Sequence, residues 1–300
     1  MTDYFYLDET HKILTGPEAR EALSHQNDAQ YLTDGQGVVR VPLSRWETAQ
    51  QFERRYWMEM NPDAKEDRNE DHFQYFEGFS VLRGRQFDHA IELGCGPFTN
   101  LRLIAQVCSV KECTLLDPLV ETYLTHPNRT YDQHLLHSET NPLYHALGKS
   151  KPLRAGRRVL RKLWPASLKM TTKIGRLLPC AIEDMPVDRT YDLIVIINVI
   201  EHCYDVQRVF ENVRALAHPG TVLVFADRYY SHETVANWVQ GKRYDAGHPL
   251  MVDQRVIDEF LDSACEVLYR NVHHHEWVVD GFDLGHDAVY FVGQMRGGQA

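Results

Sequence analysis

The sequence predicts an α/β protein built on a doubly wound sheet. A short apolar strand, Ala90–Leu93, is followed by two glycines and then by the opening of a helix at 99–106. The segment Leu193–Ile197 is apolar on both faces, as expected at the centre of a parallel sheet. An amphipathic helix at 205–217 leads to a further apolar strand at 221–227, so strands and helices alternate along the chain.

The glycine turn is suited to a ligand. Gly94 and Gly96 turn the chain tightly and leave room for a ligand to approach the backbone. The free N–H groups of the following helix favour polar or anionic ligand atoms. Strand, turn and helix therefore form the first half of a nucleotide-binding βαβ unit. Thr99 replaces the third glycine of the dinucleotide fingerprint, which disfavours a dinucleotide oxidoreductase.

Two carboxylates accompany the turn. Glu92 lies two residues before the first glycine, and Asp117 ends the next apolar strand, 113–116. A carboxylate at Asp117 can bind both hydroxyls of a ribose. A pyrophosphate would be poorly placed beside Glu92, whereas an aminoacyl ammonium would be well placed. This combination resembles the class I S-adenosylmethionine (SAM)-dependent methyltransferases.

The resemblance extends over residues 87–294. The segment 179–186 is similar to the family's third motif, in which a turn holds adenine, and 198–205 closely resembles its fourth motif. The resemblance implies the class I methyltransferase fold, a seven-stranded Rossmann-like sheet that ends in two antiparallel strands, here 265–271 and 287–294. It also implies SAM as the cofactor, with contacts from Glu92, Gly94, Cys95, Gly96, Asp117, Pro118, Ala181, Ile182, Glu183, Asn198 and Val199.

The polar and aromatic loop 228–251 is expected to carry part of the acceptor site, because loops at the carboxyl ends of strands carry the site in open α/β sheets. We expect Tyr230 and Tyr244 in this loop, together with Trp57, to contact the substrate. The predicted general base is His248, since neutral imidazole is available near pH 7. His202 and Asp227 are the alternatives. For His202 a role in local structure, and for His248 an ordinary position in the loop, is the other interpretation.

Residues 1–80 are predicted to form a helical cap or lid, and 81–300 the methyltransferase core. Ser44 and Glu47 form a capping box at the start of a helix that ends near Asn61-Pro62. A second helix is predicted at 71–81. The first helix either packs on the core or walls the pocket with its aromatic side chains, because methyl transfer requires exclusion of water.

An insertion, 118–178, is predicted after the second strand. Between Thr140 and Ile182 there are ten Lys and Arg and no acid, in a chain of net charge −10. The pattern at 153–164 is typical of a basic amphipathic helix at an anionic surface, so 149–176 is a candidate peripheral contact. The alternative is that these charges pair with the acidic remainder of the chain. No metal site is expected from the four histidines of the insertion, His126, His134, His137 and His145.

The composition also bears on where the protein is located and on which partners it has. No apolar run reaches the length of a membrane span, and the first residues carry no basic leader, so a cytoplasmic protein is expected. The six cysteines form no C-x-x-C pair and are expected to be reduced thiols. Nucleic acid is disfavoured as a partner by the acidic charge and by the lack of a recognised nucleic-acid module.

These observations predict methyl transfer from SAM to an oxygen or nitrogen of a small-molecule or glycan-like acceptor, including a phosphorylated or lipid-linked sugar. The alternative is a SAM-binding or sensing module without catalysis. The aromatic loop and the N-terminal helix favour the enzyme, because a sensor needs no acceptor pocket.

Overall fold

The computed structural model describes most of the 300 residues, and every structural statement below concerns these ranges. They are 5–8, 12–24, 32–33, 36–62, 72, 76–139, 169–240, 243–279 and 282–296.

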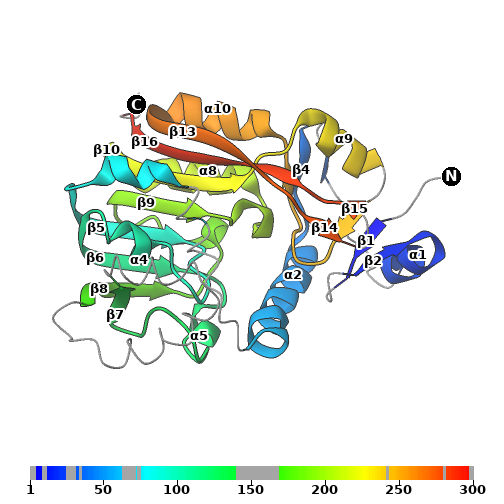
Figure 1. The fold of residues 1–300 in the computed structure, drawn as a ribbon, viewed down its shortest axis with the longest axis horizontal. Coiled ribbons are helices and arrows are strands. Elements are labelled where there is room, and N and C mark those ends of the chain that lie inside the picture. Colours follow the sequence, from blue (N-terminus) through cyan, green and yellow to red (C-terminus); the bar gives the residue numbers. More distant parts are fainter. Residues whose placement is uncertain are drawn as a thin grey trace, which may run out of the picture.

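An eight-stranded mixed sheet forms the centre of the molecule, in the order β13-β16-β10-β9-β5-β6-β8-β7 (Figure 1). The five strands from β10 to β8 pair in parallel, β16 pairs antiparallel with both its neighbours, and β7 pairs antiparallel with β8. The strand bounds are β5 Gln86–Leu93, β6 Ser109–Leu116, β7 Leu135–Glu139, β8 Lys169–Leu178, β9 Tyr191–Ile197, β10 Ala217–Arg228, β13 Cys265–His275 and β16 His286–Met295.

The predicted doubly wound α/β fold is confirmed. The parallel strands β5, β6, β9 and β10 and the antiparallel finish of β13 and β16 lie where the sequence predicts them. Both β7 and β8 come from the predicted insertion, 118–178, which was not expected to join the sheet. Strand order changes direction between β5 and β9, so the loops at their carboxyl ends part there and leave room for a ligand.

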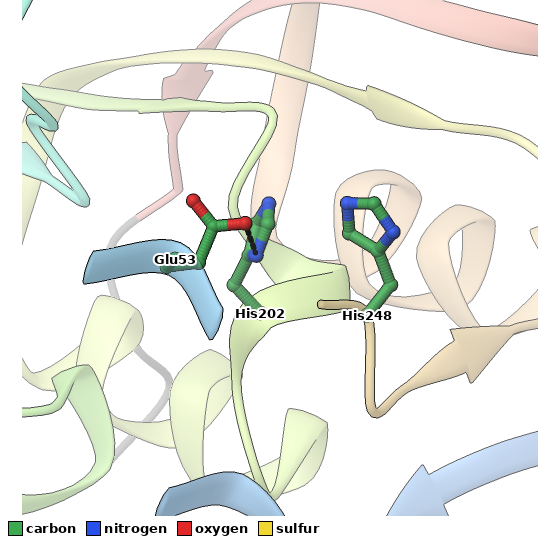
Figure 2. Close-up of side chains that lie close together, drawn as sticks. All are labelled: Glu53, His202 and His248. Atoms are coloured by element: carbon green, nitrogen blue, oxygen red, sulfur yellow. Dashed lines mark ion pairs between the residues drawn. The ribbon is translucent and has the colours of Figure 1, made fainter. Parts of the chain in front are cut away.

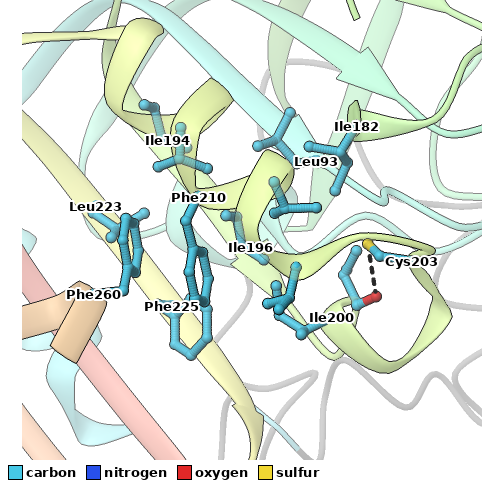
Figure 3. Packing of buried hydrophobic residues seen from close by; sticks show 14 of the residues in the cluster. Leu93, Ile182, Ile194, Ile196, Ile200, Cys203, Phe210, Leu223, Phe225 and Phe260 are labelled. Atoms are coloured by element: carbon cyan, nitrogen blue, oxygen red, sulfur yellow. Dashed lines mark hydrogen bonds between the residues drawn. The ribbon is translucent and has the colours of Figure 1, made fainter. Parts of the chain in front are cut away.

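The central strands are buried on both faces, as their sequences predict. Alternate residues of β9 enter two different cores: Ile194 and Ile196 pack in one, Leu193 and Val195 in the other, and all four are fully buried. Figure 3 shows the first core, where Phe210 stacks on Phe260 with ring centroids 4.0 Å apart. Burial of this apolar surface is the main driving force for folding.

Two helices cover one face of the sheet and shorter ones the other. The first core includes side chains of α8 (Val206–Ala215) and α10 (Gln254–Ala264). The second includes α4 (Leu101–Ile104), α5 (Val120–Tyr123) and the 3-10 helix Glu77–Leu82. Of the helix predicted at 71–81, the structure describes this 3-10 turn, His72 and Phe76.

The N-terminal segment is not purely helical, contrary to expectation. Its strands pair with strands from the segment after β10, as β1 does with β11 in parallel and β4 with β12 antiparallel. The N-terminal elements lie beyond one end of the central sheet (Figure 1). The remaining bounds are β1 Phe5–Leu7, β2 Ile13–Thr15, α1 Gly16–Ser24, β3 Leu32–Thr33, β4 Gly37–Arg40, α2 Leu43–Arg55, α9 His232–Gln240, β11 Arg243–Asp245, β12 Met251–Val252, β14 Val278–Val279 and β15 Phe282–Asp283.

Helix α2 begins differently from the prediction. Its N-cap is Pro42, whose backbone is extended, and no side chain caps the helix. The predicted cap, Ser44, lies inside the first turn, where its carbonyl accepts a hydrogen bond from the Thr48 hydroxyl at 2.9 Å. Proline supplies the fixed φ that a helix start needs, so the capping box is not used. A π-helical turn, Tyr56–Met60, extends α2 and ends at Asn61, as expected.

Most of the basic segment, residues 140–168, lies outside the described ranges, and so does His145. Two of its later residues are described in β8: Lys173 Nζ lies 3.1 Å from Glu112 Oε2, and Arg176 Nη1 lies 2.8 Å from Asp188 Oδ1. These two charges therefore pair within the chain. The predicted adenine segment, 179–186, begins directly after the end of β8 and contains a 3-10 turn, Ile182–Asp184. Among the described helices, none is long and apolar enough to cross a membrane.

Asp205 caps α8 and offers a test of local stability. Its side chain accepts a hydrogen bond from the Arg208 N–H at 3.2 Å. Asp205→Ala should lower the free energy of unfolding by about 0.5–2 kcal/mol, measured by urea denaturation. Asp205→Asn keeps the capping oxygen and should lose less, while Glu211→Ala, at an exposed position of α8, is the control. Equal losses in the two Asp205 variants would contradict a capping role.

Candidate functional site

A cavity of about 790 Å³ opens at the carboxyl ends of the central parallel strands. Its walls come from the turns after β5, β6, β9 and β10, from α2, and from residues 275–277 at the end of β13. Ligand pockets commonly measure roughly 300–1,000 Å³, so this cavity has room for a cofactor. It lies where strand order reverses between β5 and β9.

The glycine turn after β5 forms the floor of the cavity. Gly94 and Gly96 have φ of +74° and +53°, the left-handed region in which glycine is favoured. A Cβ at Gly94 would lie 2.5 Å from the Val199 side chain, so the turn also packs closely against the segment after β9. At Gly96 a Cβ would meet open space, which leaves the backbone exposed to a ligand.

Asp117 joins this turn to the end of β6. Its Oδ2 accepts a hydrogen bond from the Gly96 N–H at 3.0 Å, and Oδ1 accepts one from the Leu119 N–H at 2.8 Å. Burial raises the pKa of the Asp117 carboxyl to about 6, against these hydrogen bonds. Asp117 and Pro118 line the cavity, and each carboxylate oxygen keeps a second lone pair for a ligand hydroxyl.

Glu92 lies elsewhere than expected. It is 1% exposed and does not line the cavity. Its two oxygens accept backbone hydrogen bonds at the start of α4, from the Asn100 N–H at 2.7 Å and the Leu101 N–H at 3.1 Å. Burial raises the pKa of Glu92 to about 7. The predicted contact with an ammonium group is therefore replaced by a structural one, because the helix start needs the acceptor.

Asn100 stands between Glu92 and the cavity. Its Nδ2 donates to Glu92 Oε1 at 3.4 Å. Its Oδ1 is buried and has no hydrogen-bond partner among the described residues. Since buried polar atoms are nearly always paired, this acceptor on the cavity wall fits a ligand donor.

The turn after β9 also lines the cavity, through Asn198 and Val199. Asn198 is the only non-glycine residue of the described ranges with a left-handed backbone, at φ +58°. Asp227 holds the turn, because its Oδ2 accepts from the Val199 N–H at 2.9 Å and the Ile200 N–H at 2.8 Å. Burial, with the Glu201 charge nearby, raises the pKa of Asp227 to about 7. Its hydrogen bonds give Asp227 a structural role at the cavity.

The predicted adenine turn also lines the cavity, through Ala181, Ile182 and Glu183. The Glu183 carboxylate is buried, and Oε1 accepts from the Tyr204 and Asp205 N–H groups at 2.5 and 2.9 Å. That oxygen is therefore occupied by the start of α8. A ligand in the cavity would therefore contact the backbone of this turn more readily than the Glu183 carboxylate.

Three further side chains meet on the far side of the cavity: Glu53 of α2, His202 of the 3-10 turn Ile200–His202, and His248 (Figure 2). We call this group the His-Glu wall. His202 Nδ1 lies 3.6 Å from Glu53 Oε1, and the two imidazole centroids are 4.6 Å apart. All three residues line the cavity, so the structure brings both predicted histidines together.

His248 is held by a carboxylate. Its Nδ1 lies 2.8 Å from Asp245 Oδ2, and its Nε2 lies 3.4 Å from Glu201 Oε1. Burial alone would lower the pKa of His248, but Asp245 and Glu201 together raise it above its ordinary value. For His202, burial and the nearby His248 and Arg228 charges lower the pKa well below its ordinary range.

The predicted substrate residues divide between two places. Trp57 lines the main cavity, where its Nε1 donates to Glu53 Oε2 at 3.1 Å. Tyr230 and Tyr244 instead line a separate cavity of about 40 Å³, a correction to the prediction. Tyr244 stacks on Tyr6 of β1 with ring centroids 5.1 Å apart. Because β11 pairs with β1, the Tyr244 side chain packs against the N-terminal segment.

Sequence reasoning missed several cavity residues. His275 and Trp277 line it, although neither was among the predicted site residues. Glu53 lies four residues before Trp57, and this helical spacing was the available signal. No local pattern marks Trp277 or Arg228, because only the tertiary fold brings them to the cavity.

The order of the sheet, with the glycine turn at its switch point and an acid ending the next strand, defines a class I SAM-dependent methyltransferase, whose cofactor is SAM. A family model described as a methyltransferase domain matches residues 82–264. Because this is more than half of the chain, the protein belongs to that family. No curated protein sequence matches the chain.

Solved structures of methyltransferases are similar in fold. The N-methyltransferase NodS from Bradyrhizobium japonicum is 19% identical, with 76% of this chain and 95% of that chain covered and a TM-score of 0.41. The 1,6-didemethyltoxoflavin-N1-methyltransferase from Burkholderia thailandensis is 11% identical, with 90% and 93% covered and a TM-score of 0.46. A SAM-dependent methyltransferase from Methanosarcina mazei is 13% identical, with 74% and 99% covered and a TM-score of 0.41.

Asp117 provides a test of the cofactor end of the cavity. Asp117→Ala removes an acceptor that lines the cavity, so SAM binding should weaken by about 1–3 kcal/mol in calorimetry. Asp117→Asn, which keeps one acceptor oxygen, should lose less. Asp88→Ala, at an exposed position of β5, is the control. Unchanged SAM affinity in a folded Asp117→Ala protein would exclude this residue from the binding site.

Proposed function

We propose that the protein transfers the methyl group of SAM to an oxygen or nitrogen atom of a small-molecule or glycan-like acceptor. One observation carries this proposal: a single cavity extends from the glycine turn to the His-Glu wall. The first end suits the cofactor. The second end offers imidazole and carboxylate groups to an acceptor, and transfer requires both molecules in one enclosure.

At the cofactor end, separate side chains and backbone groups are available to bind each part of SAM. Asp117 would bind the ribose hydroxyls, and the backbone at Gly94, Cys95 and Gly96 would lie against the ligand. The ammonium of the methionine part would donate to the buried, unpaired Oδ1 of Asn100, with Glu92 behind it.

The adenine and methionine portions involve the two remaining turns. The backbone at Ala181 and Ile182 would face the adenine ring, with Glu183 beside it. Asn198 and Val199 would lie beside the methionine part, in the turn held by Asp227. When bound, SAM supplies an electrophilic methyl group on a positively charged sulfur.

Aromatic side chains enclose the acceptor end. Trp57 packs edge-on against Phe98 at 5.6 Å and against Tyr56 at 5.1 Å. Trp46 also lines the cavity, and its indole N–H donates to the His202 carbonyl at 3.0 Å. Exclusion of water by this group strengthens the electrostatic interactions of the site.

His248 is the proposed proton acceptor when the wall binds no other ligand. Asp245 holds Nδ1, which favours the tautomer with its proton there and leaves a lone pair on Nε2 of this cavity-lining residue. Asp227 is less suited, because both its oxygens accept backbone hydrogen bonds. For His202, the carboxylates of the described residues lie farther from the ring, at 3.6 Å for Glu53 and 3.8 Å for Glu201.

The remaining predictions belong to the same proposal. Residues 1–80 act as the cap and 81–300 as the core, with the insertion 118–178 and an anionic-surface contact through 149–176. All six cysteines are unpaired thiols, which supports the cytoplasmic location, because disulfides are rare there. The acidic net charge supports the expectation that nucleic acid is not the acceptor.

A screen of hydroxyl- and amine-bearing metabolites and sugars with methyl-labelled SAM, read by mass spectrometry, tests the proposal. We expect label in one acceptor class and formation of the demethylated cofactor in equal amount. Tight SAM binding without methylation of any acceptor would favour the non-catalytic sensing module.

Asp245→Asn tests the acceptor end once an acceptor is known. Loss of the carboxylate that orients His248 should lower kcat on the order of 10²–10⁴-fold, while SAM affinity in calorimetry stays unchanged. Glu233→Gln, at an exposed position of α9, is the control and should retain full turnover. If Asp245→Asn keeps wild-type kcat, the histidine takes no part in the reaction.

A further inference from the structure

We propose that Glu53, His202 and His248 bind one divalent transition-metal cation, which holds the acceptor oxygen or nitrogen in the cavity. The inference rests on the proposed function, since it names a ligand for the acceptor end of the same site. The three side chains offer one carboxylate oxygen and two imidazole nitrogens, all within 4.8 Å of one another. Two histidines and one carboxylate are a recurrent ligand set for zinc and for non-haem iron.

The distances suit such a cation. Bonds of about 2.0–2.1 Å in tetrahedral geometry place ligand atoms roughly 3.3 Å apart. His202 Nδ1 and Glu53 Oε1 are 3.6 Å apart, so only small side-chain rotations are needed at this pair. In Figure 2 the Glu53 carboxylate and a ring nitrogen of His248 lie on either side of His202.

Neighbouring residues orient two of the proposed metal ligands, His248 and Glu53. Asp245 Oδ2 lies 2.8 Å from His248 Nδ1, so Nε2 is the nitrogen that remains for a metal. Trp57 Nε1 donates to Glu53 Oε2 at 3.1 Å, and the other oxygen, Oε1, faces His202. Metal-binding histidines commonly donate their second nitrogen to a carboxylate, and metal-binding carboxylates are themselves hydrogen-bonded.

His202 adds an independent observation. Its Nδ1 is buried and has no hydrogen-bond partner among the residues that the structure describes. Buried polar side-chain atoms usually have a partner, so this nitrogen calls for one. In the ion pairs of the site, Nδ1 lies 3.6 Å from Glu53 Oε1, and a cation bound by these two atoms would give the nitrogen its partner.

The surrounding charges favour a cation. Glu201 Oε1 lies 3.4 Å from His248 Nε2 and 3.8 Å from His202 Nε2, and its other oxygen pairs with Arg228 Nε at 2.7 Å. Asp245 adds a third carboxylate, and Arg45 Nη1 donates to the nearby Ala246 carbonyl at 3.1 Å. Three carboxylates thus face two guanidinium groups. Two imidazole ligands favour zinc-like or iron-like ions over magnesium or calcium, which prefer oxygen.

The cavity side of the wall leaves coordination positions for an acceptor. A hydroxyl bound there would lose its proton to water more readily, since a bound cation lowers the pKa of an oxygen ligand. In transfer the methyl carbon–sulfur bond breaks with its electron pair on sulfur, the oxygen–carbon bond forms, and the proton leaves the hydroxyl. In this state His248 is a metal ligand and not the proton acceptor.

The test uses the full chain without an affinity tag, freed of metal with a chelator and titrated with Co²⁺. Visible absorption should show a four- or five-coordinate Co²⁺ spectrum that saturates at one equivalent and disappears when Zn²⁺ is added. Glu53→Gln and His202→Asn should weaken binding on the order of 100-fold, and Asp245→Asn should weaken it by about 10–100-fold. Calorimetry with SAM shows that each variant is folded.

Two matched variants serve as controls. Glu47→Gln changes an exposed carboxylate on the same helix as Glu53, and His274→Ala removes an exposed histidine from the run 273–275. Both should bind Co²⁺ as the wild type does. Absence of a saturable Co²⁺ spectrum, or an unchanged spectrum in Glu53→Gln, would overturn the metal site. Methylation at the same rate by metal-free protein would also overturn it, yet would leave the proposed methyl transfer standing.

Discussion

The site depends on the hydrogen bonds that the Asp227 carboxylate accepts. Through its hydrogen bonds to the Val199 and Ile200 N–H groups, the end of β10 fixes the turn that follows β9. Val199 then packs against Gly94, where a Cβ would lie only 2.5 Å away, and so sets the position of the glycine turn. The same turn ends at His202. One buried carboxylate therefore aligns both the cofactor end and the acceptor end of the cavity.

Local patterns predicted the parallel strands, the glycine turn and the acid at Asp117, because each depends on residues close in sequence. The role of Glu92 could not be predicted, because the same carboxylate suits a ligand ammonium or a helix start, and only the fold shows which is nearer. Tyr244 was misplaced for a related reason. The pairing of β11 with β1 turns it away from the cavity, and no periodicity in either segment indicates that partner.

Tyr230, the other tyrosine predicted to contact the substrate, does not line the main cavity but holds Arg228. The Arg228 guanidinium donates to the Tyr230 hydroxyl at 3.0 Å and pairs with Glu201 at 2.7 Å. The pair is 13% and 4% exposed, so both charges are largely removed from water. Such pairs contribute little net stability, and breaking one is strongly destabilising. Tyr230 therefore supports the charge arrangement behind the His-Glu wall.

The N-terminal strands have a consequence for how the molecule is made. During synthesis β1 and β4 leave the ribosome long before their partners β11 and β12 exist. Contacts between segments so distant in sequence form slowly, because loop-closure entropy opposes them. The cofactor end draws on the continuous segment from β5 to β10 and can assemble earlier. A nascent chain should therefore be able to bind the cofactor before the acceptor end of the cavity has formed. The two ends of one cavity would then fold in a fixed order.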